Sequence, residues 1–430
     1  MKIRESITKE DLDSYRAALD SLKNPKKKDI SVVKVILIVL YFVFCLIIGL
    51  ALGYYSQKTG HRASNTSKSK LLLTALLFGG WFFVSSLLQI IIHEGGHLLF
   101  GLLTGYHFIS FRVGSFTIAK INGKLKFKKL QVGGTGGQCL LAPPSFEEGK
   151  KYPYFWYNAG GGVLNFLTAG LSLLLLFIGN GYVSLAVGIF AFLGIANGLT
   201  NLIPMIIGVP NDGKNIQYAH RDPLSLRCLY LQLAINTDLT NGKKLDELPE
   251  EYFDLGDDFS CSNTLIVTVV LMDYYRQLLM ENKEKAAHLL SVLMESRFQM
   301  GTMIQSVIEA ESMASRILEG AEIPEIAAYQ KRVAPILSKI KMDTGLCRIR
   351  CLFATAFSPE EQEKIAWLSS STKGALPKTL PRFRPQLPQT LREELQTVYE
   401  KQPVFGEAEC HLRLADRQIA YLSEITQNNR

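Results

Sequence analysis

The sequence predicts a mainly α-helical membrane protein that has about four transmembrane helices, a small β-hairpin insertion and a C-terminal soluble helical domain. Three observations predict this fold class. Hydrophobic residues make up 47% of the 430-residue chain, but nearly all long apolar runs fall before about residue 210. A short stretch within that half alternates apolar and polar residues, as half-buried strands do. Beyond about residue 216, apolar residues recur at helical spacing in a sequence of soluble character.

Residues 1–31 form a polar segment ahead of the first apolar run. They include Glu5, Glu10 and Asp11, and the apolar run begins only near Val32. A cleaved signal peptide carries its apolar core much closer to the N-terminus. We therefore expect residues 1–31 to be a cytosolic segment that leads into a retained membrane anchor.

Residues 32–215 contain four apolar runs long enough to cross a bilayer, which requires about 20 helical residues. They cover approximately Val33–Tyr55, Leu71–Thr104, Gly160–Ile178 and Tyr182–Pro204. The second run has about 34 residues, or some 50 Å of helix. Its helix must therefore tilt, bend at Gly79-Gly80 or project from the membrane.

Basic residues flank these runs unevenly. Lys26, Lys27 and Lys28 precede the first run, and the loop spanning residues 112–151 carries further lysines. Because lysine and arginine favour the cytoplasmic side, we expect this loop and both termini in the cytoplasm of a multi-pass protein, most naturally in a bacterial cytoplasmic membrane. The basic clusters lack interleaved aromatic residues, so no nucleic-acid partner is predicted.

Residues 108–140 have the pattern of a β-hairpin insertion. Phe116–Ile121 and Lys124–Lys128 alternate apolar and polar residues on either side of Asn122-Gly123. Asn-Gly between two such segments is a strong signal for a two-residue hairpin turn. The glycine-rich residues 133–137 follow, and no Lys-Ser/Thr pair opens a helix after them. They therefore indicate flexible or closely packed backbone rather than a phosphate-binding loop.

Residues 216–375 predict a soluble helical domain. Apolar residues between Tyr274 and Leu293 recur at helical spacing around a break at Asn282, a pattern similar to one tetratricopeptide-like helical pair. Residues 376–430 then comprise a proline-rich linker and one last helix from about Gln389 to Gln427. We expect residues 216–430 to dock a cytosolic regulator.

The chemistry centres on His93, Glu94 and His97, which form a His-Glu-x-x-His pattern. On a helix, residues four apart project from nearly one face, so both imidazoles can bind one Zn²⁺. Glu94 can then act as general base toward the metal-bound water. Two unrelated histidines are the alternative interpretation. However, three ionisable side chains within the apolar run Leu88–Leu103 are costly unless they are paired or bound to a metal.

A third metal ligand must come from elsewhere in the chain. Leu103 occupies the position where an extended motif places a third histidine. Glu147 and Glu148 are candidates in a charged loop, and Asp212 is the better candidate because the fourth apolar run ends there. On the residues alone, a plain turn aspartate before Gly213 is the favoured interpretation of Asp212.

Taken in order, these segments resemble the site-2 protease family of intramembrane zinc metalloproteases. That family has a His-Glu-x-x-His helix, a central Gly-Pro-x-x-Asn segment and a later Asn-x-x-Pro…Asp-Gly motif. The matching residues here are His93, Glu94 and His97; Gly161 to Asn165, with Gly162 in place of proline; and Asn201, Pro204, Asp212 and Gly213. The resemblance covers about residues 70–215. In the last motif, the spacing from Pro204 to Asp212 is about three residues longer than usual, and Asn211 replaces the usual leucine.

The resemblance implies a zinc metalloendopeptidase that cleaves a membrane-protein or membrane-peptide substrate in or near its transmembrane segment. It implies His93, His97 and Asp212 as zinc ligands and Glu94 as the catalytic residue. It also places Asn165 and Asn201 at the substrate. Buried asparagines often form helix–helix hydrogen bonds instead, and both roles are compatible.

The family also carries a membrane-associated β-hairpin, which coincides with the one predicted here. We expect an edge at Phe116–Ile121 to pair with the unwound substrate.

Two other functions remain open on the sequence. One is a catalytically silent membrane scaffold that binds partners through its helical domain. The other is a different membrane zinc peptidase, such as a prenyl-protein protease, with a downstream glutamate as the third ligand.

Overall fold

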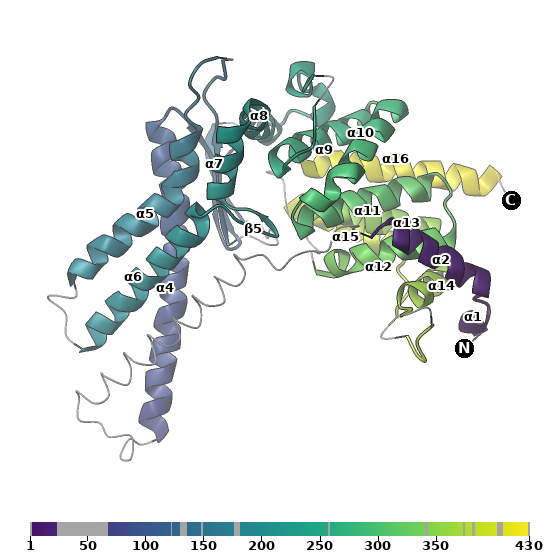
Figure 1. The fold of residues 1–430 in the computed structure, drawn as a ribbon, viewed down its shortest axis with the longest axis horizontal. Coiled ribbons are helices and arrows are strands. Elements are labelled where there is room, and N and C mark those ends of the chain that lie inside the picture. The colour runs from purple at the N-terminus through teal and green to yellow at the C-terminus, as the bar shows by residue number, and fades with distance from the viewer. Residues whose placement is uncertain are drawn as a thin grey trace.

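The computed structural model describes residues 2–23, 68–121, 123–129, 136–147, 149–175, 181–256, 259–339, 343–372, 375–380, 383–401 and 407–428. The first predicted span, Val33–Tyr55, lies outside these residues, as does Glu148. Figure 1 shows long helices and a sheet on one side of the molecule, and a helical domain that contains both ends of the chain on the other.

Three apolar helices, here called the α4–α6 bundle, pack against one another: α4 (Lys68–Leu103), α5 (Tyr154–Leu174) and α6 (Gly181–Leu202). Within α4, Leu76–Leu103 is long and apolar enough to cross a membrane. Within α6, Ala186–Leu202 is a shorter apolar helical segment. Large apolar side chains on the outer faces are exposed, such as Phe83 at 63% and Leu171 at 65%. Side chains of this kind mark a surface that lipid or a partner covers.

A four-stranded antiparallel sheet follows α4, in the order β3-β2-β1-β4. The strands are β1 (His107–Val113), β2 (Phe116–Ile121), β3 (Lys124–Lys129) and β4 (Gly137–Ala142). The predicted Asn-Gly hairpin is confirmed, because Ile121 pairs with Lys124 and Gly123 has a φ of +76°, which glycine adopts without strain. The insertion has nearly the predicted bounds but contains four strands, because β1 and β4 extend the hairpin on one side.

The expectation that Phe116–Ile121 offers a free strand edge is wrong. This strand, β2, pairs with β1 on one side and with β3 on the other, so its backbone groups are already used. Among the described residues, the edges of the sheet are β3 and β4. Any edge pairing with a substrate must therefore use one of those two strands.

A short β-hairpin with two residues in each strand links the bundle to the rest of the chain. Strands β5 (Ile206–Ile207) and β6 (Val209–Pro210) turn at Gly208, which has a φ of +79°. Helices α7 (Asp212–Arg221) and α8 (Pro223–Thr240) follow. Apolar residues of α8, including Leu233, pack against the sheet and so join the bundle to the helical domain.

The helical domain continues from α8 through short helices and α9 to α16. The bounds are η3 (Leu245–Glu247), η4 (Glu250–Tyr252), α9 (Thr264–Leu279), α10 (Lys283–Ser296), η5 (Arg297–Gln299), α11 (Thr302–Leu318), α12 (Ile323–Lys339), α13 (Thr344–Ala356), α14 (Pro359–Ser369), α15 (Pro388–Lys401) and α16 (Glu407–Asn428). The predicted break at Asn282 is confirmed, because its side chain caps α10. The single last helix predicted from Gln389 to Gln427 is wrong, because this stretch contains the two helices α15 and α16. Pro403 lies between them in the sequence and cannot continue a helix.

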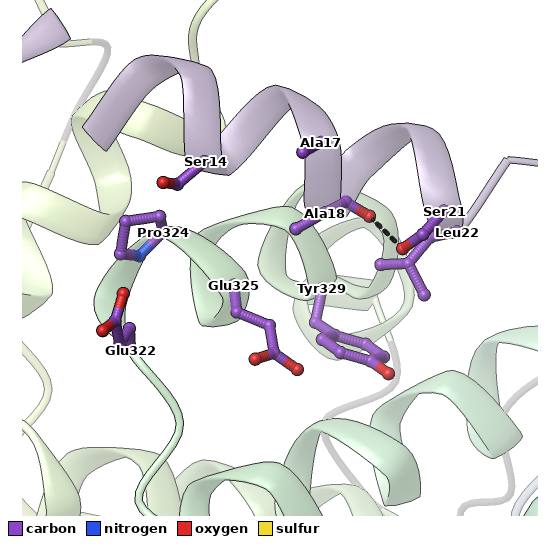
Figure 2. Close-up of a pocket in the computed structure, with 9 residues that line it drawn as sticks. All are labelled: Ser14, Ala17, Ala18, Ser21, Leu22, Glu322, Pro324, Glu325 and Tyr329. Carbon is purple, nitrogen blue, oxygen red and sulfur yellow. Dashed lines mark hydrogen bonds between the residues drawn. The ribbon is translucent and has the colours of Figure 1, made fainter. Parts of the chain in front are cut away.

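The N-terminal helices α1 (Lys2–Glu5) and α2 (Lys9–Ser21) belong to the helical domain rather than to a separate segment. Tyr15 is buried among side chains of this domain, and Asp11 forms an ion pair of 3.1 Å with Lys364. A cavity of about 510 Å³ lies between α2 and α12. Figure 2 shows the residues that line it, among them Glu325 and Tyr329 of α12. Residues 2–23 and the helical domain therefore lie on the same side of any membrane that α4 crosses.

Candidate metal centre

Three predicted ligands converge in the structure. His93 and His97 lie one turn apart on α4, and Asp212 is the first residue of α7. The Nε2 atoms of His93 and His97 are 3.1 Å apart. Asp212 Oδ2 lies 3.2 Å from His93 Nε2 and 3.4 Å from His97 Nε2. This cluster could hold a metal ion.

The spacing of the three atoms fits a tetrahedral ion. Ligand atoms about 2.0–2.1 Å from such an ion lie about 3.3–3.4 Å from one another. The three observed separations, 3.1, 3.2 and 3.4 Å, fall within about 0.2 Å of that range. Two imidazoles and one carboxylate also suit zinc and several other transition ions chemically.

The Asp212 carboxylate supports the same conclusion. Its Oδ2 atom is buried and accepts no hydrogen bond from the described residues. A buried, ionised oxygen without a hydrogen bond is costly, and a cation held between it and the imidazoles offsets that cost.

Carbonyl groups behind the histidines fix which ring nitrogen faces the centre. His97 Nδ1 donates to the backbone carbonyl of Tyr157 at 2.7 Å, and His93 Nδ1 donates to Asn165 Oδ1 at 2.9 Å. Because these oxygens only accept, each Nδ1 carries the proton and each Nε2 keeps its lone pair for a metal.

Asn165 occupies a different place from the substrate contact expected for it. It is fully buried, and its amide nitrogen donates to both the backbone and the side chain of Gln89. Gln89 in turn donates to the carbonyl of Phe190 on α6. Both groups of the Asn165 side chain are thus engaged, so it links three helices and orients His93 rather than meeting a substrate.

The Asn201 side chain is hydrogen-bonded within its own helix. It donates to the carbonyl of Asn197 at 2.9 Å. The backbone carbonyl of Asn201 lies close to Gly213, the residue after Asp212. The structure therefore gives its backbone, and not its amide group, a place next to the segment that carries the third ligand.

Glycines allow α4 and α5 to meet backbone to backbone. A Cβ atom on Gly161 would lie 2.7 Å from His97 Nε2, and one on Gly96 would lie 2.2 Å from the carbonyl oxygen of Gly160. Each glycine costs a helix about 1 kcal/mol relative to alanine. The close approach of α5 to the imidazoles explains Gly161, whereas Gly160 lies against Gly96 and Phe100 of α4 and Gly162 lies against Leu202 of α6.

Glu94 lies beside the cluster, where the sheet covers α4. Its side chain is buried, and a Cβ atom on Gly137 would lie only 2.5 Å from Glu94 Oε1. Arg112 of β1 donates to the carbonyls of Gly114 and Gly137, at 2.9 and 3.1 Å, and so fastens the start of β4 next to Glu94. No local signal in the sequence singles out Arg112 or Gly137; the glycine-rich stretch 133–137, of which the structure describes residues 136 and 137, predicted flexible or closely packed backbone.

Asn211 is a site residue that the sequence analysis did not assign. Its Oδ1 accepts from the backbone N–H groups of Met205 and Lys214, and its Nδ2 donates to the carbonyls of Thr200 and Ile203. It caps α7 and ties that helix to the end of α6, which fixes Asp212 in place. An asparagine directly before the first residue of a helix is the signal that could have identified this role.

Glu147, the alternative third ligand, does not join the cluster. Its side chain is 57% exposed and pairs with Lys150.

Comparisons with protein-family models, curated proteins and solved structures found no match to this chain. The assignment of the centre therefore depends on the motifs and on the geometry described above.

Proposed function

We propose that this protein is an intramembrane zinc metalloprotease that hydrolyses a peptide bond in or near a transmembrane segment of a membrane-protein substrate. The observation that carries the proposal is the convergence of His93, His97 and Asp212 within a bundle of apolar helices, with Glu94 beside them. Ionisable groups in such surroundings are retained for function far more often than for stability.

The residues divide the chemistry among themselves. His93, His97 and Asp212 would hold zinc, which when bound lowers the pKa of a coordinated water and polarises the scissile carbonyl. Glu94 takes one proton from the attacking water and passes it to the amine that leaves. The hydroxyl group ends on the carbonyl carbon and the proton on the amine nitrogen, so the hydrolysis is balanced.

The substrate must be extended where it is cut, because a helix has no exposed peptide groups to pair with a strand. The strand that adjoins Glu94 is β4, which begins at Gly137 and is an edge of the sheet. Pairing of the substrate near Gly137 would bring its peptide bond next to the Glu94 carboxylate. This assignment replaces the one made from the sequence at Phe116–Ile121.

The proposed topology has four membrane spans. Helix α4 supplies one, and the exposed apolar faces of α5 and α6 support two more. The run Val33–Tyr55, expected from the sequence to be a span, brings the number of spans to four. An even number of spans places both ends of the chain on the same side of the membrane, which agrees with the packing of α2 on the helical domain. The centre lies in the last third of α4, toward the sheet and the helical domain, so water from the cytoplasm has a short path. We assign residues 216–430 the docking of a cytosolic regulator and place the protein in a bacterial cytoplasmic membrane.

The test compares membrane proteomes of cells that express the wild type or Glu94→Gln. Loss of a general base lowers the rate about 10²–10⁴-fold, so a fragment present with the wild type should vanish with the variant. The variant should still bind zinc, and Glu147→Gln should behave as the wild type because that side chain is exposed and remote. Identical fragment patterns for the wild type and Glu94→Gln would favour a catalytically silent membrane scaffold instead.

A further inference from the structure

The helical domain contacts the segment that carries the third metal ligand. Gly301, at the start of α11, lies against the tip of the β5–β6 hairpin: a Cβ atom there would be 2.1 Å from the carbonyl oxygen of Gly208. The same Cβ atom would lie 3.0 Å from the Cγ2 methyl of Ile206. No side chain other than that of glycine fits this contact without a shift of the hairpin or of α11.

The corner that holds Gly301 is fixed within the helical domain. Met300 is buried, and its sulfur accepts a hydrogen bond from Thr264 of α9. Arg297 pairs with Glu309 at 3.4 Å, and Arg332 of α12 donates to the same buried carboxylate. The position of Gly301 therefore follows from the packing of α9, α11 and α12.

The other end of the hairpin is joined directly to the metal centre. Asn211 closes the hairpin by exchanging hydrogen bonds with Met205, and Asp212 is the next residue. Only three residues separate the Gly208 contact from the Asp212 ligand. Metal sites require their ligands within about 0.5 Å of the correct position, so a shift of the hairpin would matter.

We propose that Gly301 is a positioning residue through which the helical domain keeps Asp212 within reach of His93 and His97. Displacement of the corner at residues 297–301 would then weaken the third ligand, which gives any regulator bound to the helical domain a route to the metal. This inference rests on the metal centre of the proposed function and does not depend on proteolysis.

The experiment measures zinc affinity of the purified full-length protein by competition with a chromophoric chelator. Gly301→Val should bind zinc at least about 10-fold more weakly than the wild type, and Gly301→Ala should show a smaller loss. Gln299→Ala is the matched control, because this exposed side chain lies in the same corner. Its affinity should equal that of the wild type. If Gly301→Val fails to fold, Gly301→Ala carries the test.

A double variant distinguishes coupling through Asp212 from general damage. In an Asp212→Ala background, Gly301→Ala should cause no further loss of zinc affinity, because the ligand on which it acts is already gone. An equal loss in both backgrounds, or wild-type affinity in both Gly301 variants, would overturn the inference. If the wild type binds zinc but Glu94→Gln leaves the proteome unchanged, only the proposed protease function is contradicted.

Discussion

The helical domain and the α4–α6 bundle both bury ionisable side chains, but they neutralise them differently. In the helical domain, Arg348 and Glu311 are fully buried and pair with each other, and Tyr275 and Gln418 add hydrogen bonds to this pair. At the metal centre, where α7 meets the bundle, Asp212 pairs only with two imidazoles among the described residues, and its Oδ2 atom accepts no hydrogen bond from them.

This difference separates a structural network from a binding site. Where opposite charges meet, burial is compensated within the protein and nothing further is required. Where two lone pairs and a carboxylate oxygen converge on one point, a bound cation would use both lone pairs and compensate the carboxylate charge. The two regions therefore predict different responses to mutation, which the following experiments compare.

The largest effect is expected for Gly161→Ala in the bundle. The added methyl group would collide with both imidazoles, so zinc affinity should fall at least about 100-fold. Gly170→Ala on the same helix is the control, because no atom lies within 4 Å of its added Cβ. Zinc titration of both variants makes the comparison. Equal zinc affinities would mean that α5 does not lie over the imidazoles.

In the helical domain, Arg348→Met should lower the free energy of unfolding by about 3–5 kcal/mol, because it leaves the buried Glu311 carboxylate without its partner. Zinc affinity should not change. Arg350→Met, which breaks a more exposed pair with Glu394, should cost at most about 1 kcal/mol. Chemical denaturation followed by zinc titration checks both statements. A loss of zinc in Arg348→Met would show that the two regions are not independent in this respect.

A smaller effect is expected for Asn165→Ala. Removal of the carbonyl that orients His93 should weaken zinc binding about 10–100-fold. Asn201→Ala should leave zinc affinity near the wild-type value, because its side chain bonds only to its own helix. If the two variants bound zinc equally well but both lost activity, the substrate role inferred from the sequence would be restored.

The smallest effect is expected for Asp246→Asn, which breaks a pair with Arg413 of α16. The hydrogen bond from Arg413 lowers the pKa of Asp246 in the folded protein. Such a pair stabilises fully above the unfolded pKa, near 4, and its contribution disappears as the pH falls through the lower folded value. The variant should therefore be less stable than the wild type by about 1 kcal/mol at pH 7 and by less in acid. A difference that grew as the pH fell would contradict this account.

Local patterns in the sequence predicted the elements that depend on neighbouring residues. The His93-to-His97 spacing, the turn at Gly123 and the helix break at Asn282 all follow from signals within a few residues, and all three are present in the structure. Asp212 was identified through a motif and not through local physics, because an aspartate before glycine is common in turns.

Features that depend on distant contacts were missed or misplaced. Strands β1 and β4 pair across about 25 residues that include β2 and β3, and the pairing of β1 with Phe116–Ile121 turns that segment from an edge into an inner strand. The packing of α2 on α12 and the role of Asn165 behind His93 depend on partners far along the chain. No local periodicity contains that information.

The most direct test of the account is the metal content of the purified full-length protein. We predict about one zinc ion per chain in the wild type and in Glu147→Ala, and a clear loss in Asp212→Ala. Zinc retained in Asp212→Ala, or its absence from a folded wild-type protein supplied with zinc, would contradict the assignment of His93, His97 and Asp212 as a metal centre.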